Sequence, residues 1–235
     1  MSTENQSVCA VVVAAGSSRR MGGENKLLLP LCGKPVLAHT LTAFQMCGAV
    51  RDIVLVCREQ DMEVYRTLAA ENGITKLRTL TRGGDTRTES VLAGVSAASE
   101  ACALVAVHDG ARPLVSDEVI TQAVDEAAKT GAAAPVVPVK DSIKRIENGK
   151  IVADVPRDTL AAVQTPQVFQ ADVLKAALQS AAEAKLPLTD DCAAVERLGK
   201  QVYLLPGNPE NIKITRPLDL AVAAAILRQR EERNA

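Results

Sequence analysis

Residues 8–16 read VCAVVVAAG, an apolar run that ends in small residues. The stretch Val8–Ala14 is continuously apolar rather than alternating, which is typical of a strand buried on both faces of a sheet. The same pattern returns at Asp52–Cys57 (DIVLVC) and Ala103–Val107 (ALVAV). Helical segments separate these runs, so the sequence predicts a mainly parallel sheet with helices on both faces. Ligands bind such sheets beyond the carboxyl ends of the strands.

The helices between the strands are marked by residues that start and stop them. Pro35 opens one helix, Ser116 caps another, and Asn72-Gly73 and Gly131 end two of them. The predicted helices are Pro35–Cys47, Gln60–Glu71, Thr86–Ser99, Ser116 to about Lys129, Ala171–Ala184, Asp190–Leu198 and Pro217–Arg230. The remaining predicted strands are Leu77–Leu80, Ala133–Val139 and Val202–Leu205.

A β-hairpin is predicted outside this alternation. Ser142–Ile146 and Ile151–Val155 flank the tetrapeptide Glu147-Asn148-Gly149-Lys150. An Asn-Gly pair between two such runs is a strong hairpin signal. We expect the hairpin to project as an arm, at about residues 140–160, from a single domain spanning residues 1–235. A projecting arm of this kind predicts a homodimer contact.

Composition and charge exclude several classes of function. The chain has 235 residues, of which 47% are hydrophobic and 23% charged, as in an ordinary globular domain. Its net charge of −1 gives no electrostatic basis for nucleic-acid binding. The sequence contains two Phe, two Tyr and no Trp, so few rings are available to stack on bases. We therefore expect no nucleic-acid partner.

The cysteines and the N-terminus predict a reducing compartment. The six cysteines are scattered without a CxxC pair, which favours buried free thiols. The first residues, MSTENQS, contain no basic signal region, and no apolar run reaches the roughly 18 residues that cross a bilayer. We expect a cytoplasmic protein without a membrane partner.

The first segment whose residues are suited to ligand binding or catalysis follows the first strand. Residues 14–23 read AAGSSRRMGG, and Lys26 follows. Small residues allow the backbone to approach a ligand closely, and their N–H groups can bind phosphates. Arg19, Arg20 and Lys26 add the positive charge that a polyphosphate requires. The spacing matches neither the GxGxxG nor the Walker A pattern, and a surface loop with solvated charges explains it equally well.

A second segment, residues 108–113 (HDGARP), follows a buried strand. Asp109 therefore lies at the carboxyl end of that strand, where a carboxylate can hold Mg²⁺ together with substrate phosphates. The alternative is that Asp109 is a turn residue. For His108 we favour a structural role, because no second histidine lies at metal-ligand spacing.

The remaining candidate segments place polar groups at the edges of predicted elements. Taken singly, each is as readily explained by a helix cap, a turn or a solvated charge. They are residues 83–90 (GGDTRTES), Arg157, residues 165–167 (TPQ), residues 189–191 (TDD) and residues 211–217 (NIKITRP).

Together and in this order, these segments resemble the 2-C-methyl-D-erythritol 4-phosphate cytidylyltransferase family. The resemblance runs from about Val8 to Leu220 and rests on AAGSSRRMG, GGDTRTESV, HDGARP, QTPQ, LTDD and NIKITRPLDL. It implies a Rossmann-like fold and the transfer of CMP from CTP to a sugar-alcohol phosphate, with release of pyrophosphate, in the non-mevalonate isoprenoid pathway. Ribitol-5-phosphate cytidylyltransferase is the nearest alternative, since it shares the fold, the nucleotide and the arm.

The resemblance also implies roles for individual residues. Nucleotide binding falls on Ala14, Ala15, Gly16, Gly84, Asp85, Ser90 and Gly110, and catalysis on Arg20, Lys26 and Lys213. Asp109 matches the metal-binding carboxylate, and Arg112, Arg157, Thr165, Thr189 and Lys213 match positions around the acceptor. In the family, Arg157 and Thr165 reach the site from the partner subunit. Ser18 and Asn25 depart from the residues that the family usually has in this loop.

The chemistry agrees with this set of residues. The attacking group would be a phosphate oxygen that is already anionic at pH 7, so no general base is required. What the reaction needs is alignment of two anions and positive charge at the α-phosphorus. A non-enzymatic nucleotide sensor would not need Asp109, Arg20 and Lys26 together. We also predict that no aromatic ring stacks on the base, which backbone groups would select instead.

Overall fold

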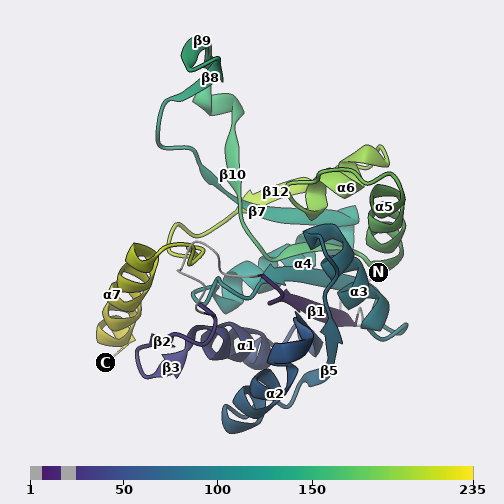
Figure 1. The fold of residues 1–235 in the computed structure, drawn as a ribbon, viewed down its shortest axis with the longest axis vertical. Helices are drawn as coiled ribbons and strands as arrows, with labels where there is room; N and C mark the ends of the chain where they lie inside the picture. The colour runs from purple at the N-terminus through teal and green to yellow at the C-terminus, as the bar shows by residue number, and fades with distance from the viewer. Residues whose placement is uncertain (1–6, 17–24, 235) are drawn as a thin grey trace.

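A computed structural model describes residues 7–16 and 25–234, and its centre is an eight-stranded sheet (Figure 1). The strand order is β10-β7-β11-β6-β1-β4-β5, with β12 also paired to β7. The strands are β1 (Val8–Val13), β4 (Val50–Cys57), β5 (Leu77–Arg82), β6 (Leu104–Asp109), β7 (Ala132–Pro138), β10 (Ala161–Val163), β11 (Gln167–Gln170) and β12 (Tyr203–Pro206). A separate small hairpin joins β2 (Pro30–Leu31) to β3 (Lys34–Pro35).

The sheet is mainly parallel, as predicted. Strand β1 pairs in parallel with β4 and β6, β4 with β5, and β7 with β12. The exceptions are β10 and β11, which were not predicted and pair antiparallel with β7; β11 also pairs antiparallel with β6. Their registers run from Ala161 opposite Pro138 to Phe169 opposite Ala132. Strands β10 and β11 therefore lie one after the other along the same edge of β7, separated by residues 164–166.

Helices cover both faces of the sheet, because alternate strand residues point to opposite sides. Val8, Ala10 and Val12 of β1 belong to a core cluster with α1, α2 and α4. Cys9 and Val11 belong to a second cluster with α3, α5 and α6. The helices are α1 (Val36–Met46), α2 (Met62–Glu71), α3 (Arg87–Ala97), α4 (Asp117–Thr130), α5 (Ala171–Glu183), α6 (Asp191–Arg197) and α7 (Pro217–Asn234), and short 3₁₀ turns are η2 (Glu59–Asp61) and η3 (Arg157–Thr159). Within the described residues, no helix is both long and apolar enough to cross a membrane.

Two helix ends follow the sequence signals closely. The Ser116 hydroxyl accepts a hydrogen bond from the Val119 N–H at the start of α4, and Gly131 ends that helix at φ 91°. At α3, the cap is Thr86, whose side chain accepts from the Glu89 N–H, while the Glu89 carboxylate accepts from the Thr86 N–H. This reciprocal capping box fixes the first turn of α3 relative to the preceding loop.

The interior contains few rings, as the composition requires. Phe44, Tyr65 and Phe169 are each fully buried, whereas Tyr203 is exposed on β12. Of the six cysteines, all are free thiols and only Cys32 is exposed, which confirms the expectation of buried thiols for the other five.

The predicted hairpin is present and projects away from the sheet (Figure 1). It consists of β8 (Ile143–Glu147) and β9 (Lys150–Val155). Its turn residues Asn148 and Gly149 have φ values of 49° and 75°, the positive values that a type I′ turn requires. We call residues 140–160 the arm; it leaves the sheet after β7 and returns to it at β10.

Candidate active site

The centre of the site is Asp109, the last residue of β6. It pairs with Val13, the last residue of β1, so the two strands end together. The Gly110 N–H donates to the Val13 carbonyl at 2.9 Å. A Cβ at Gly110 would lie 3.1 Å from that carbonyl oxygen and 3.5 Å from the Ala14 Cβ. The HDGARP segment therefore lies directly against the start of the small-residue loop.

Cationic side chains surround the Asp109 carboxylate. Lys213 Nζ lies 2.8 Å from Oδ2, and Arg112 Nε lies 3.5 Å from the same oxygen. Burial by itself would raise the pKa of Asp109. The positive charges of Lys213, Arg87 and Arg112 outweigh burial and lower this pKa to about 2. Asp109 is thus an ionised carboxylate at neutral pH.

A hydrogen-bonded layer beneath Asp109 holds its backbone. The Asp109 N–H donates to Thr165 Oγ1 at 3.2 Å, and this hydroxyl lies 3.0 Å from His108 Nδ1. His108 Nε2 lies 3.2 Å from the carbonyl oxygen of Arg112, which can only accept, so Nε2 bears the proton. Since burial lowers the pKa of His108 to about 4, the ring is neutral and Nδ1 accepts from the Thr165 hydroxyl.

This layer corrects one expectation and supports another. We expected Thr165 to reach the site from a partner subunit, but the Thr165 side chain is buried and bonded to Asp109 and His108 of its own chain. The expectation that Thr165 comes from the partner is therefore wrong. The structural role favoured for His108 agrees with its full burial and its two hydrogen bonds within the chain.

The NIKITRP segment packs against HDGARP and so places Lys213. The Ile214 N–H donates to the Ala111 carbonyl at 2.8 Å, and Arg112 Nη1 donates to the Asn211 carbonyl at 2.6 Å. Asn211 is fully buried and donates through Nδ2 to the Thr165 carbonyl at 2.9 Å. No pattern in the sequence indicated that Asn211 joins these segments, because only its position within the motif singled it out.

Lys26 connects the far end of the nucleotide loop to the same region. Its Nζ donates to the Ile214 carbonyl at 2.7 Å, beside Lys213 in the chain. Arg20, the other basic residue predicted for the triphosphate, lies outside the described residues. The structure therefore brings Lys26 and Lys213, predicted catalytic residues from opposite ends of the sequence, to one side of the site.

Small residues permit a close contact on the nucleotide side. A Cβ at Gly83 would lie 2.7 Å from the Ala15 Cβ and 2.8 Å from Ser90 Oγ, so only glycine fits there. The Ser90 hydroxyl donates to the Thr86 carbonyl at 2.9 Å. Ala15 and Ser90, both predicted nucleotide-binding residues, are thus brought together by Gly83.

Three further predicted nucleotide-binding residues, Gly84, Asp85 and Gly16, differ in how closely other atoms surround them. Gly84 also has no room for a side chain, since a Cβ would lie 2.3 Å from the Glu89 Cβ. Asp85 is exposed, and the residue that caps α3 is Thr86. Gly16 has open space around its backbone among the described atoms.

A buried ion pair links this edge to the TDD segment. Arg87, the first residue of α3, donates through Nη1 and Nη2 to Asp191 Oδ1 and Oδ2, at 2.7 and 2.8 Å. Gln167 Oε1 accepts from the backbone N–H of Asp191 at 3.1 Å, and its Nε2 donates to Asp190 Oδ2 at 3.1 Å. Arg87, Gln167 and Asp191 lay in segments that the sequence singled out, but no pattern indicated that they bind one another.

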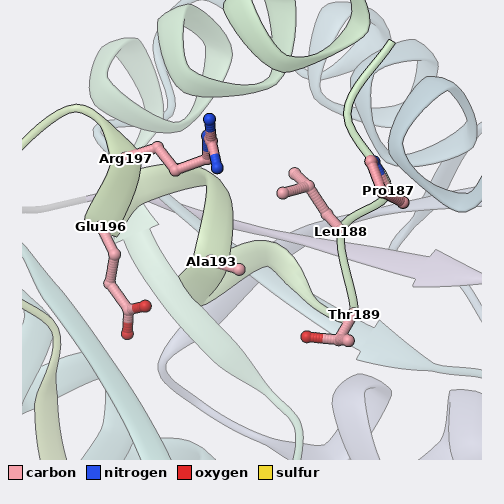
Figure 2. Close-up of a pocket in the computed structure, with 6 residues that line it drawn as sticks. All are labelled: Pro187, Leu188, Thr189, Ala193, Glu196 and Arg197. Atoms are coloured by element: carbon pink, nitrogen blue, oxygen red, sulfur yellow. The ribbon is translucent and has the colours of Figure 1, made fainter.

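Thr189, predicted to contact the acceptor, lines a pocket of about 360 Å³. The pocket lies between residues 187–189 and the side chains of α6 (Figure 2). Its lining residues are Pro187, Leu188, Thr189, Ala193, Glu196 and Arg197.

The chain does not bring its own Arg157, a predicted acceptor-binding residue, close to Asp109. It lies in η3, between β9 and β10, and its Nη1 donates to the Lys140 carbonyl at 3.1 Å. Figure 1 shows this part of the arm well away from the sheet.

The fold and the site together define a Rossmann-like nucleotidyltransferase, with a small-residue loop, a carboxylate and two lysines at the carboxyl ends of parallel strands. A sequence profile narrows this class, because the profile of the 2-C-methyl-D-erythritol 4-phosphate cytidylyltransferase (IspD) family matches residues 8–229. The chain belongs to this family.

Individual relatives agree. The chain is 44% identical to the 2-C-methyl-D-erythritol 4-phosphate cytidylyltransferase of Halalkalibacterium halodurans over 95% of this chain and 98% of the relative. Among solved structures it is similar to the 4-diphosphocytidyl-2C-methyl-D-erythritol synthase of Anaerococcus prevotii, with a TM-score of 0.85, 27% identity, and coverage of 95% and 96% of the two chains. The cytidylyltransferase of Thermus thermophilus gives a TM-score of 0.77 at 32% identity, with coverage of 95% and 100%.

Proposed function

We propose that this protein transfers CMP from CTP to 2-C-methyl-D-erythritol 4-phosphate and releases pyrophosphate, a step of the non-mevalonate isoprenoid pathway. Membership of the family supports this assignment. The structural observation that supports it best is the Asp109–Lys213 pair at 2.8 Å, at the strand end that also adjoins Ala14. That pair places a fixed negative and a fixed positive charge where two anionic substrates would meet.

The reaction is a single in-line displacement. A phosphate oxygen of the acceptor forms a bond to the α-phosphorus of CTP, the bond from that phosphorus to the bridging oxygen breaks, and pyrophosphate leaves with the electron pair. The attacking phosphate is anionic near pH 7, so the protein supplies alignment and positive charge rather than a base. Lys26, Lys213 and Arg20 are the proposed catalytic cations. Ala14, Ala15, Gly16, Gly84, Asp85, Ser90 and Gly110 form the proposed nucleotide site.

The residues around Asp109 fit one Mg²⁺ ion. Within the described part of the chain, no group of three or more His, Cys, Asp or Glu could form a complete protein site. Mg²⁺ needs no such group, since it binds one or two carboxylates and takes its other ligands from water and phosphates. Lys213 and Arg112 both approach Oδ2 of Asp109, so Oδ1 is the oxygen that we assign to the metal. Bound there, Mg²⁺ would neutralise charge on the triphosphate.

The acceptor site is proposed to include Arg112, Thr165, Thr189, Lys213 and, from a second chain, Arg157. The arm supports a homodimer because it presents apolar side chains to solvent. Ile146 is 69% and Ile151 is 68% exposed, and the two face each other across the hairpin. Large exposed apolar groups on a projecting hairpin are typical of a protein interface. We propose that the chain is a single nucleotidyltransferase domain that acts as a cytoplasmic homodimer.

The assay that tests this function compares acceptors and nucleotides. Purified protein with Mg²⁺ should release pyrophosphate from CTP with 2-C-methyl-D-erythritol 4-phosphate, and much more slowly with ribitol 5-phosphate or when ATP or GTP replaces CTP. Lys26→Ala and Arg20→Ala should each lower kcat by about 10²–10³, the usual cost of losing one preorganised charged contact. Faster turnover of ribitol 5-phosphate would assign the chain to the alternative activity. Near-native rates in both variants would refute the proposed catalytic cations.

A further inference from the structure

The ion pair between Arg87 and Asp191 joins the two helices that begin at the substrate sites. Arg87 is the first residue of α3, and Asp191 is the first residue of α6. We propose that Arg87, Asp191 and Gln167 are positioning residues that hold the acceptor segment at Thr189 in register with the nucleotide loop. This inference rests on the proposed function, because it assigns the two sides of the pair to the two substrates.

On the nucleotide side, Arg87 is fixed to the loop that precedes it. Thr86 and Glu89 form the capping box, so the first turn of α3 cannot rotate independently of residues 83–86. Gly83 in turn is in direct contact with Ala15 and Ser90. The position of the Arg87 guanidinium is therefore set by the same contacts that shape the nucleotide edge.

On the acceptor side, Gln167 and Asp190 fix the start of α6. Gln167 is buried, and its Oε1 accepts from the N–H groups of Asp191 and Cys192 at 3.1 and 3.2 Å. Asp190 Oδ1 accepts from the Ala193 N–H at 3.0 Å and caps the helix. Thr189 directly precedes this cap, so its backbone has little freedom relative to α6.

Side chains join the two sides, and the geometry of the Arg87–Asp191 pair is demanding. Arg87 forms two parallel hydrogen bonds to one carboxylate, and Asp191 is almost completely buried. A planar guanidinium fixes both distance and orientation in such a fork, whereas a lysine ammonium would fix only distance. The pair is therefore suited to fixing the position and orientation of the start of α3 relative to the start of α6.

Arg87 also acts on the centre of the site. Its positive charge is among those that lower the pKa of Asp109 against the opposing effect of burial. Gln167 lies next to the Thr165–Pro166 pair in the chain, and Thr165 binds the Asp109 N–H. Arg87 and Gln167 thus connect nucleotide loop, acceptor segment and carboxylate without belonging to the set of substrate-contacting residues.

The test separates positioning from simple stabilisation by removing both charges at once. Replacing a buried ion pair with apolar residues of similar size usually preserves the fold, so Arg87→Met/Asp191→Leu should keep the native far-ultraviolet circular dichroism and melt within a few degrees of the native protein. We expect its kcat/KM for 2-C-methyl-D-erythritol 4-phosphate to fall by about tenfold or more, since small misplacements of reacting groups are costly. The KM for CTP should change by less than about threefold, because the loop itself is intact.

The control is an ion pair between a buried carboxylate and an exposed arginine at the other end of the sheet. Asp52 Oδ1 lies 2.9 Å from Arg78 Nε near the start of β4, and Arg78→Met/Asp52→Leu should leave both kinetic constants near native. Native kinetics in a folded Arg87→Met/Asp191→Leu variant would show that the pair is only structural and would overturn the proposal, as would an equal loss in CTP affinity. If that variant does not fold, Arg87→Lys decides in the same way, with an expected intermediate loss in kcat/KM. A native protein that turns over no acceptor would refute the proposed function itself, and this inference with it.

Discussion

Lys213 Nζ lies 2.8 Å from Asp109 Oδ2, although the two residues belong to distant parts of the sequence. The hydrogen bond from the Ile214 N–H to the Ala111 carbonyl holds the segments together. Asp109 is buried, and burial alone favours the protonated acid. Among the three cations that outweigh burial, the lysine therefore has the largest effect in keeping this carboxylate charged.

Replacing Lys213 should reveal this balance directly. In Lys213→Met, the pKa of Asp109 should rise from about 2, because burial is the largest influence on this group and Lys213 is the largest influence that opposes it. Carboxyl ¹³C NMR of the free protein, followed from pH 7 to pH 3, should show Asp109 becoming protonated in the variant while it stays ionised in the native protein. Lys144→Met, which removes a lysine from the arm, should leave the Asp109 titration unchanged. An Asp109 pKa still near 2 in Lys213→Met would contradict this account.

The lowered pKa of His108 predicts how the stability of the protein depends on pH. Its pKa is lowered from 6.5 to about 4 in the folded state, so the unfolded chain binds the proton more tightly. The contribution of the neutral ring is complete above about pH 6.5, declines as the pH falls, and is lost near pH 4, a total of about 3 kcal/mol. Urea unfolding of the native protein and His108→Asn at several pH values should show a steeper decline for the native protein. His39→Gln should retain the native slope, and parallel slopes for the native protein and His108→Asn would be evidence against a neutral His108.

The close packing around Gly83 predicts that a substitution there weakens the binding of CTP in particular. A methyl group there would lie 2.7 Å from the Ala15 Cβ and 2.8 Å from Ser90 Oγ, so Gly83→Ala must push the two sides of the loop apart. We expect the KM for CTP to rise by about tenfold or more, in line with the cost of small displacements at a binding site. Gly48→Ala is the matched control, because an added Cβ there meets nothing within 4 Å. Equal kinetics in the two variants would argue against the close approach at Gly83.

The close packing around Gly94 predicts that a substitution there lowers the stability of the fold. An added Cβ would lie 2.4 Å from Val11 Cγ1 and 2.6 Å from Val56 Cγ2, where α3 packs on β1 and β4. Gly94→Ala should therefore lower the free energy of unfolding by about 1–3 kcal/mol, although alanine favours helix. Thermal or urea denaturation measures the difference, again with Gly48→Ala beside it. A stabilised Gly94→Ala would mean that α3 can move away from the sheet without cost.

The exposed apolar pair on the arm predicts a change of oligomeric state when both residues are made charged. Ile146→Glu/Ile151→Glu places two charges on its exposed apolar pair and should convert a dimer into a monomer, as measured by light scattering on a sizing column. Val64→Glu alters an exposed valine of α2 and should remain dimeric. A dimeric double variant would move the proposed interface away from the arm.

The strands and the carboxylate were predictable from local sequence for a common reason. Continuous apolar runs such as Val8–Ala14 have no alternative to burial, and Asp109 directly follows such a run. Strands β10 and β11 were missed because they are only three and four residues long and depend on pairing with β7. A short segment without its own pattern becomes a strand only when tertiary contacts place it beside a partner.

The pairing of Arg87 with Asp191 was missed for a related reason. Each residue lies in a segment that the sequence marked as polar and helix-initiating, and each could have been a solvated charge. Their contact depends on α3, α5 and α6 packing on the same face of the sheet, which no spacing along the chain encodes. Sequence patterns locate such residues, whereas only the packed helices decide which of them meet.

The way in which the arm leaves the sheet makes it a separable module. Pro138 at the end of β7 is paired directly with Ala161 at the start of β10, so the excursion begins and ends at one point of the framework. Insertions or deletions can change the length and the tip of the arm without altering the order or the pairing of the strands in the sheet. Mutation can therefore remodel the arm, and with it any surface that the arm presents to another chain, while the sheet that carries Asp109 keeps its own constraints.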